Sequence, residues 1–591
     1  MEYRVIRGAQ EFLPFMDKLQ KAKTLGIDTE TDGLDVHSNR MRLLQIAAEG
    51  LPVLLFDWNA FSGQGDREAA RNRELLRKCL ETDAVKVFHN AKFDLKFLHK
   101  EGIRAGRVFD TMLAAQLLRG CGGSVKASLA AVAAYYLGEE VDKTEQKGDW
   151  SGELTRSQLE YAARDAELLL RLKPRLEKEL AKYGLEKVAE IEFACVSAIA
   201  LTEYEGIYLD EKKWEQLCAG TRASYEEALE RLYAYSGVPA RQLTLWGEEE
   251  ALDVNFDSNS YVLRLLKKNG IDVKSTSRAS LAPYHAHPLV RALSDYRRYA
   301  KLLNGFLYPM PQMIHPITGR LHPSYGQIGA WSGRMSCGNP NIQQIPRERA
   351  FRGCFCAPKG RKLILADYSQ IELRVAAQIS GDTRMRRAYR RGEDLHLLTA
   401  SLISNTKAEM VTKEQRQAAK AVNFGLIFGM GAAGLQQYAA QSYGVDMTLE
   451  EARRFRDSFF EAYPGISWWH HDLMEKYGQS GGSALGSTLT GRKFRLSSRA
   501  GVAELANTPV QGTAADILKR ALGLLYPEAV GRGWKIVAIV HDEILLEVAE
   551  EEAPEAARIL KLKMEQAASD ILPQVPCLAD ARIAESWAGK A

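Results

Sequence analysis

The sequence contains little of what defines several common protein classes. Only eight of its 591 residues are cysteine, and they are scattered, which excludes a disulfide framework and favours reduced thiols. Cys354 and Cys356 are one residue too close for a CxxC metal or redox motif. With 47 glycines and 19 prolines, the chain is neither collagen-like nor of low complexity. Its length exceeds what one hydrophobic core organises, so we expect several folded domains.

Long apolar segments and a strong net charge are also missing. The longest apolar run, residues 127–137, is too short to cross a bilayer, and the N-terminus shows no secretory signal, so we expect no membrane partner. The formal net charge is only +4. Between Arg334 and Arg391, however, thirteen Lys and Arg residues stand against four Asp and Glu. This basic band indicates either a polyanionic ligand or a solvated helix surface.

The spacing of apolar residues divides the chain near residue 183. Before it, strand-like runs such as KTLGIDTE and AVKVFHN alternate with helical patterns, which predicts an α/β domain. Residues 183–310 are mostly helical and charged, and they predict long helices projecting from a body. Strand patterns return in RKLILADYS and WKIVAIVHDEILLEV, on either side of a long helical stretch. The second part therefore predicts a mixed α+β domain.

Four acidic residues of the first domain lie next to apolar runs that fix their backbone. Asp28 and Glu30 alternate at the end of a strand and point to one face, while Asp94 and Asp165 lie on predicted helices. Each alone is typical of an ordinary surface charge. Together they can converge on one site of an α/β fold. Such hard oxygen ligands suit two Mg²⁺ ions, which can activate a water and stabilise the leaving oxygen of a phosphodiester.

The second domain offers another set of acids. Asp367 ends an apolar strand, and Asp542 and Glu543 lie in the tight turn of a predicted β-hairpin. A charged hairpin turn is the simpler interpretation of the latter pair. The two aspartates are nevertheless well placed to hold two Mg²⁺ ions between a primer 3′ oxygen and a nucleoside triphosphate.

A helix between these acids carries both cations and aromatic rings. Arg416, Lys420, Phe424 and Phe428 recur at every fourth residue and predict one stripe along that helix. An aromatic stripe usually packs in a core, but cations on the same face favour phosphates at one end and a stacked base at the other. GMGAAG at 429–434 follows a helix rather than a strand, which excludes a dinucleotide-binding fingerprint, and no P-loop sequence occurs.

Ordered motifs give the chain a specific resemblance. DxE, NxxxD and YxxxD resemble the three motifs of proofreading 3′→5′ exonucleases, and DYSQIELR, RxxxKxxNFGxxxG and VHDE resemble motifs A, B and C of family A DNA polymerases. The similarity extends to WSGRMSCGNPNIQQIP, GEDLHLLTA and ANTPVQGTAADI, and so covers nearly the whole chain. Because the chain starts directly at the exonuclease motifs, we expect the large-fragment architecture without a 5′ nuclease domain.

The resemblance implies an α/β, RNase H-like exonuclease domain followed by a mixed α+β right-hand polymerase domain. The expected boundaries are 1–182 for the exonuclease, 183–591 for the polymerase, about 183–310 for the thumb, about 311–375 and 461–591 for the palm, and about 376–460 for the fingers. The implied partners are primer–template DNA and dNTPs, and the implied cofactor is Mg²⁺, two ions per site, with Mn²⁺ as a substitute.

Roles for single residues also follow from the resemblance. In the exonuclease the metal ligands would be Asp28, Glu30, Asp94 and Asp165, with Tyr161 orienting the attacking water and Asn90 contacting the substrate. In the polymerase the metal ligands would be Asp367 and Asp542, supported by Glu543. Lys420 would be the proton donor to the pyrophosphate. The other expected substrate contacts are Arg416, His396, Phe424, Phe428, Gln370, Glu372 as a steric gate against a ribose 2′ oxygen, and Arg334, Asn507, Gln511 and His541 on the primer–template.

The leading hypothesis is a DNA-dependent DNA polymerase with proofreading, a monomer in the cytoplasm of a bacterium or encoded by a phage, with an organelle not excluded. Phe428 departs from the family, which usually has tyrosine there. One alternative is a 3′ exonuclease for repair or RNA processing with an inactive polymerase-like domain, against which intact Asp367, Lys420 and Asp542 argue. Another is a non-catalytic scaffold for nucleic acid, which a gel shift without turnover in Mg²⁺ would favour.

Overall fold

The structure, a computed structural model, describes residues 2–589 apart from 64, 123–125, 141–144, 146–147, 238–240, 244–248, 252–253 and 481–484. The eight cysteines are all free, as the sequence predicts. Within the described ranges, no helix combines the length and apolar character needed to span a membrane.

The N-terminal domain is built on a six-stranded sheet with strand order β1-β4-β3-β2-β5-β6. Its elements are β1 (Tyr3–Ile6), α1 (Ala9–Lys21), β2 (Thr24–Thr31), β3 (Met41–Ala47), β4 (Val53–Asp57), α2 (Trp58–Ser62), α3 (Asp66–Leu80), β5 (Val85–Phe88), α4 (Ala91–Lys100), β6 (Val108–Asp110), α5 (Thr111–Gly120), α6 (Leu129–Leu137) and α7 (Arg156–Lys182). Strand β2 lies inside the sheet, antiparallel to β3 and parallel to β5. The predicted α/β domain is confirmed.

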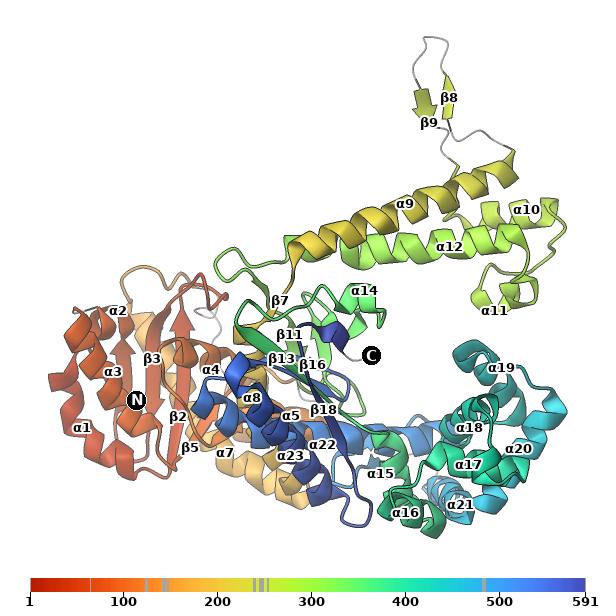
Figure 1. Cartoon of the computed structure of the whole chain (residues 1–591). Coiled ribbons are helices and arrows are strands. Elements are labelled where there is room, and N and C mark those ends of the chain that lie inside the picture. The colour runs from red at the N-terminus through yellow and green to blue at the C-terminus, as the bar shows by residue number, and fades with distance from the viewer. Residues whose placement is uncertain are drawn as a thin grey trace.

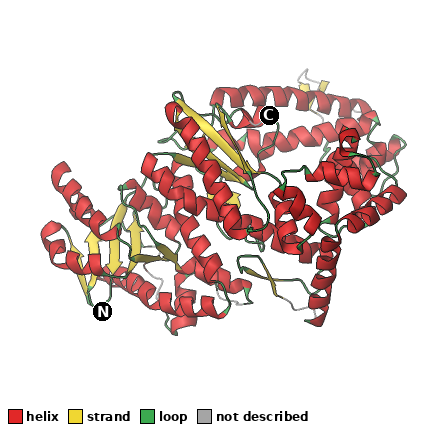
Figure 2. Cartoon of the chain, turned by 60° about the horizontal axis from the view of Figure 1, so that its bottom comes forward, coloured by secondary structure: helices red, strands yellow, loops and turns green. Residues whose placement is uncertain are grey.

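Helices cover both faces of this sheet. Successive residues of a strand point to opposite faces, so β3 sends Leu44 and Ile46 into a core with α1, α3 and α4, and Leu43 and Ala47 into a core with α7. Figure 2 shows the strands between helices on either side. Burial on both faces explains why these strands are nearly continuous apolar runs in the sequence.

The next segment forms a projecting arm and its base. Its elements are α8 (Glu186–Glu205), β7 (Ile207–Tyr208), α9 (Glu211–Ser236), β8 (Arg241–Leu243), β9 (Glu249–Ala251), α10 (Asn259–Lys268), α11 (Arg278–Leu281), α12 (Pro288–Leu302) and α13 (Pro309–Gln312). Helices α9 and α12 pack along each other and reach away from the body (Figure 1). Helix α8 does not project. It lies in the body against α22 and β16, which differs from the expectation that the helices of residues 183–310 project.

The rest of the chain forms a four-stranded antiparallel sheet, in the order β16-β17-β13-β18, and a helical lobe. The elements are β10 (Arg320–Leu321), β11 (Ser324–Gly326), β12 (Ser336–Gly338), α14 (Arg349–Arg352), β13 (Arg361–Tyr368), α15 (Ile371–Ser380), α16 (Thr383–Arg390), α17 (Leu395–Ser404), α18 (Lys413–Leu426), α19 (Ala432–Tyr443), α20 (Leu449–Ala462), α21 (Pro464–Gln479), β14 (Leu485–Ser487), β15 (Lys493–Arg495), α22 (Val502–Arg532), β16 (Lys535–Val540), β17 (Glu543–Ala549), α23 (Ala553–Ile571) and β18 (Ala579–Ala584). The predicted mixed α+β domain and its β-hairpin are confirmed.

Buried ion pairs fasten α8 to both halves of the molecule. On the N-terminal side, the Glu203 carboxylate accepts hydrogen bonds from Lys92 and Lys96 of α4, each at 2.8 Å. On the other side, the buried Glu192 carboxylate lies 2.5 Å from the Lys519 ammonium of α22. Breaking a buried pair leaves an uncompensated charge, which is strongly unfavourable. Helix α8 is therefore tied to both domains by ion pairs.

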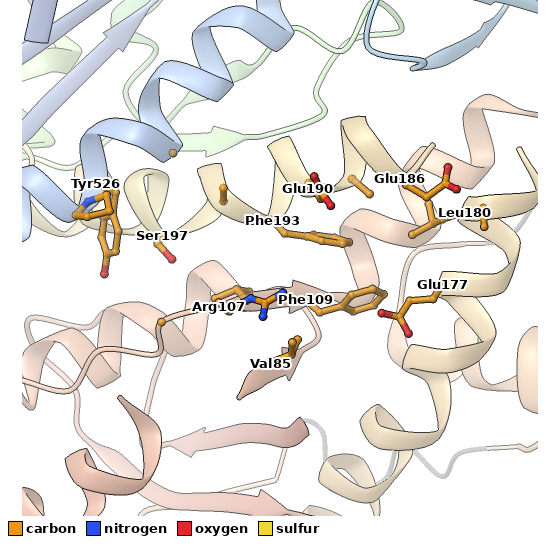
Figure 3. A pocket seen from close by; sticks show the side chains of 17 residues that line it. Val85, Arg107, Phe109, Glu177, Leu180, Glu186, Glu190, Phe193, Ser197 and Tyr526 are labelled. Carbon is orange, nitrogen blue, oxygen red and sulfur yellow. The ribbon is translucent and has the colours of Figure 1, made fainter. Parts of the chain in front are cut away.

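A pocket of about 630 Å³ opens beside α8, between β5, β6, α7 and α22 (Figure 3). Phe109 of β6 and Phe193 of α8 face each other in its wall, with ring centroids 4.6 Å apart. Val85, also in the wall, pairs with Thr24 at the start of β2. The pocket thus lies at the opposite end of the sheet from Asp28 and Glu30, and it is separate from the carboxylates described next.

Two candidate active sites

The first carboxylate cluster forms where α7 crosses β2. Helix α7 comes this close because Gly26 has no side chain: a Cβ there would lie 2.3 Å from the carbonyl oxygen of Ala166. This contact brings Asp165 of α7 to Asp28 and Glu30 of β2, whose carboxylates interact with it electrostatically. Asp94, in the first turn of α4, completes the set. The structure therefore brings together all four acids that the sequence singled out.

Burial dominates the electrostatics of this cluster. Asp94 and Asp165 are 2% and 5% exposed. Burial raises the pKa of Asp94 to about 7 and that of Asp165 to about 6. The pKa values of Asp28 and Glu30 are held well above their usual range, first by burial and then by repulsion from the other carboxylates. Four acids packed this way disfavour their own ionisation unless positive charge lies among them.

The donor set fits divalent cations. One carboxylate oxygen of Asp165, Oδ1, is buried without a hydrogen-bond partner among the described residues. Tyr161, one turn earlier on α7, hydrogen-bonds Asp165, and burial raises the pKa of its hydroxyl, so the hydroxyl keeps its proton. Thr29 donates to Asp94 at 2.7 Å and fixes that carboxylate. Carboxylate oxygens gathered in this way are the ligands that Mg²⁺ prefers, and the buried Oδ1 of Asp165 is available to bind one.

Asp110 positions this cluster, although sequence reasoning did not identify it. It is 1% exposed, and its carboxylate accepts from the backbone N–H of Asn90 (3.2 Å) and of Ala91 (2.8 Å). Asn90 has φ +67° and immediately precedes α4. Asp110 thereby fixes the start of the helix that carries Asp94. Its position at the end of a short apolar strand, before a helix, is the signal that could have found it.

The second carboxylate cluster lies at one end of the four-stranded sheet. Asp367, on the inner strand β13, is in register with Glu543 of β17. Asp542 precedes Glu543 in the turn from β16, where His541 has φ +56°. The structure thus brings the three predicted acids to one edge. On the other side of β13, Asp580 of β18 is also in register with Asp367, but its carboxylate lies 2.7 Å from the Arg582 guanidinium.

Arg352 also supports this cluster, and the sequence analysis did not identify it. Its guanidinium lies 3.3 Å from Glu543, which is only 4% exposed, and 4.2 Å from the centre of the Trp587 ring. The Asp367 carboxylate also acts on the charge of Arg352. Asp367, Asp542 and Glu543 bring to this edge the carboxylate oxygens that divalent cations prefer as ligands.

Helix α18 of the lobe carries the predicted stripe, with one correction. Arg416 is held by Asp394 through two hydrogen bonds of 2.9 and 2.6 Å, and the Lys420 ammonium lies 5.9 Å from the centre of the Tyr443 ring. Phe424 follows on the same face, half-buried. Phe428 lies beyond the helix, which ends at Leu426. The prediction that all four residues share one helical stripe is therefore wrong for Phe428.

His396 lies deeper than a substrate contact needs. Its side chain is 2% exposed, its Nδ1 lies 2.9 Å from Asn423 Nδ2, and its ring centroid is 5.8 Å from that of Phe424. Burial lowers its pKa to about 4, so the imidazole is neutral. In this structure His396 packs against Phe424 from the buried side of that ring.

The remaining predicted contacts surround the start of α15 and the side of α22. Glu372, in the first turn of α15, forms an ion pair with Arg334, and Arg334 also influences His541 electrostatically. Gln370 caps α15 with φ +56° and accepts from the Tyr389 hydroxyl at 3.3 Å. Asn507 and Gln511 are one turn apart on α22 and share a face.

Comparisons with known proteins identify the family of each domain. Residues 222–589 match the model of DNA polymerase family A, and residues 3–181 match that of a 3′-5′ exonuclease. The chain is 34% identical to DNA polymerase I of Aquifex aeolicus, over 99% of the chain and 100% of that protein. It is 32% identical to DNA polymerase I of Chloroflexus aurantiacus, over 85% of the chain, and spans only 54% of that relative. A solved structure, the POL domain of Pol1 from M. smegmatis in complex with DNA primer-template and dNTP, is similar with a TM-score of 0.79 and 26% identity over 99% of both chains.

Proposed function

As a member of DNA polymerase family A, this chain is a DNA-directed DNA polymerase with a 3′→5′ exonuclease domain, and we propose that the two carboxylate clusters are its two active sites. The observation that carries the proposal is that each domain gathers its own acids at the end of its own sheet. The M. smegmatis complex supports primer–template DNA and dNTPs as the ligands.

In the exonuclease site, Asp28, Glu30, Asp94 and Asp165 would hold two Mg²⁺ ions. When bound, these ions would lower the pKa of a water and stabilise the leaving 3′ oxygen, and Mn²⁺ would accept the same ligands. Tyr161, whose hydroxyl keeps its proton, would orient the attacking water, and Thr29 keeps Asp94 in place. Asn90, fixed by Asp110, would contact the primer end.

In the polymerase site, Asp367 and Asp542 would hold the metal ions. Glu543, paired with Arg352, would maintain the conformation of the turn between β16 and β17. Arg416 and Lys420 on α18 would neutralise the triphosphate, and Lys420 would donate a proton to the leaving pyrophosphate. Phe424 would pack on the incoming nucleotide, with Glu372 against its ribose. Arg334, Asn507, Gln511 and His541 would contact the primer–template.

The proposal divides the chain into an exonuclease at 1–182 and a polymerase at 183–591. Because α8 lies in the body, we place the start of the thumb at α9, near residue 211, rather than at 183. The palm would contain the four-stranded sheet and the fingers the lobe that begins after α15. Both clusters are complete within one chain, which supports action as a monomer, and the bacterial relatives support a cytoplasmic location.

The proposal is tested by separating the two activities. Labelled primer–template with Mg²⁺ is extended when dNTPs are present and shortened from its 3′ end when they are absent. The double variant Asp28→Ala, Glu30→Ala should lose shortening and keep extension, and Asp542→Ala should do the reverse, each loss amounting to orders of magnitude. Asp580→Ala is the matched control, because its carboxylate is engaged by Arg582. Near-normal extension by Asp542→Ala would refute the second site.

A further inference from the structure

A tryptophan stands exposed at the tip of a hairpin beside the polymerase site. Strands β11 and β12 pair from Ser324 with Gly338 to Gly326 with Ser336, which leaves residues 327–335 as their connecting loop. Trp331, at the middle of this loop, is 71% exposed. An exposed indole offers a ligand a large apolar surface together with one N–H donor.

The loop that carries Trp331 is held rigidly. The backbone N–H groups of Gly329 and Ala330 both donate to the carbonyl of Arg334 at 3.1 Å, and that of Gly333 donates to Ala330 at 2.9 Å. From α22, the buried Lys519 ammonium donates to the Gly333 carbonyl at 2.7 Å. The ring is thus presented on a fixed backbone, and a preorganised aromatic side chain loses little entropy on binding.

The loop also lies where the DNA is expected. A Cβ at Gly512 of α22 would lie 2.7 Å from the Ser332 carbonyl oxygen, so the loop rests on this helix directly beside Gln511. At the other end of the loop, Arg334 pairs with Glu372. The loop that carries Trp331 thus contains Arg334 and packs against α22, the helix that carries Asn507 and Gln511, and the proposed function assigns primer–template contacts to all three residues.

We propose that Trp331 is an additional DNA contact, packing its ring against the deoxyribose and base edges of the primer–template in the minor groove. This inference rests on the proposed function, which places the duplex along α22 and Arg334. Apolar side chains that enter the minor groove bind by contact and displacement of water. Such a contact involves no phosphate, so it strengthens binding without releasing counterions.

The test measures the affinity of the full chain for a fluorescein-labelled primer–template by anisotropy between 50 and 200 mM salt. Trp331→Ala should bind about tenfold more weakly at every salt concentration, with an unchanged slope of log Kd against log salt. Trp331→Phe should keep most of the affinity. Trp468→Ala is the matched control, because Trp468 is 75% exposed but lies on α21, away from this loop, and it should bind normally.

Arg334→Ala separates failure of this inference from failure of the proposed function. It should weaken binding, because it removes a guanidinium from the primer–template contact that the proposed function assigns to Arg334. Unchanged binding by Trp331→Ala, with Arg334→Ala weakened, would overturn the role of Trp331 and leave the function intact. Unchanged binding by both variants would overturn the role of Trp331 and also the primer–template contact assigned to Arg334. A melting temperature of Trp331→Ala equal to that of the wild type would show that the variant is folded.

Discussion

Single side chains decide the selectivity proposed for the polymerase site. Glu372 is the clearest example, because burial raises the pKa of its carboxyl while its ion pair with Arg334 fixes where the side chain lies. A side chain held in this way can exclude a ribose 2′ hydroxyl by its bulk. Selectivity by exclusion is lost when the excluding group is shortened.

Glu372→Ala should raise the efficiency of rNTP insertion relative to dNTP insertion about tenfold to a hundredfold, since a steric penalty of a few kcal/mol disappears. Single-nucleotide insertion kinetics measure this ratio. Glu372→Gln keeps the length of the side chain and weakens its pairing with Arg334, so it should remain selective. If Glu372→Ala were as selective as the wild type, Glu372 would not be the steric gate.

Phe424→Tyr should make the enzyme accept dideoxynucleotides much more readily, by about tenfold or more, with dNTP insertion nearly unchanged. A normal dNTP supplies a 3′ hydroxyl that bonds its own phosphate oxygen; a ddNTP leaves that buried acceptor unpaired, which costs roughly 1–3 kcal/mol. The tyrosine hydroxyl would replace the missing donor.

The ddNTP/dNTP ratio should be measured in the exonuclease-deficient Asp28→Ala, Glu30→Ala background, so that terminators are not removed. Phe428→Tyr is the matched control, because it makes the same substitution at a residue beyond the end of α18. Equal ratios for Phe424→Tyr and its parent would mean that Phe424 does not face the sugar.

Contacts between whole elements position the exonuclease acids. Gly26→Ala would put a Cβ 2.3 Å from the backbone of α7, which must then move away from β2 and carry Asp165 with it. We expect 3′ shortening to fall at least about tenfold, because small displacements of catalytic groups have large effects on rate, while primer extension stays normal.

Gly152→Ala is the control for that experiment. Gly152 belongs to the same domain, and a Cβ there would meet nothing within 4 Å. It should keep full exonuclease activity. Normal 3′ shortening by Gly26→Ala would mean that the contact between β2 and α7 does not set the geometry of the cluster.

The periodicity of the sequence predicted well where helices and strands lie, but it did not predict which residues contact each other across the fold. The acids Asp28 and Glu30 stand out because a regular strand fixes their spacing, and β2 appears where KTLGIDTE predicts it. The predicted stripe on α18 does not extend to Phe428, because side-chain spacing does not show where helical hydrogen bonding ends. Gly429, with φ +72°, lies just beyond the helix. Arg352 acts through Glu543, 191 residues away in the sequence, and no local pattern reports such a contact.

At the scale of the whole molecule, a histidine cluster joins the two domains. His37, from the loop after β2, has its ring centroid 4.4 Å from that of His322 and 5.3 Å from that of His315, both from the second domain. His315 also lies 2.9 Å from the Asp35 carboxylate, and Arg320 and Lys100 act on the cluster electrostatically. Burial lowers the pKa of His322 to about 4 and also lowers that of His37.

Acid should therefore weaken this junction. Below about pH 6.5 the unfolded chain protonates its histidines, whereas folded His322 resists protonation down to about pH 4, so the free energy of unfolding falls across that window. Melting temperatures at pH 7 and pH 5 measure the effect. His322→Gln, which does not titrate, should lose fewer degrees than the wild type. An equal loss in both proteins would exclude His322 as a source of the pH dependence.

Helix α8, fastened by buried ion pairs to Lys92 and Lys96 on one side and to Lys519 on the other, has a consequence for error correction. If the two carboxylate clusters are the active sites that we propose, this helix would hold them apart, and the primer end would reach the exonuclease site only after separating from its template. The choice between extension and editing would then depend on how easily the terminal base pair melts. A mismatched or weakly stacked end would open more often and would be removed more often.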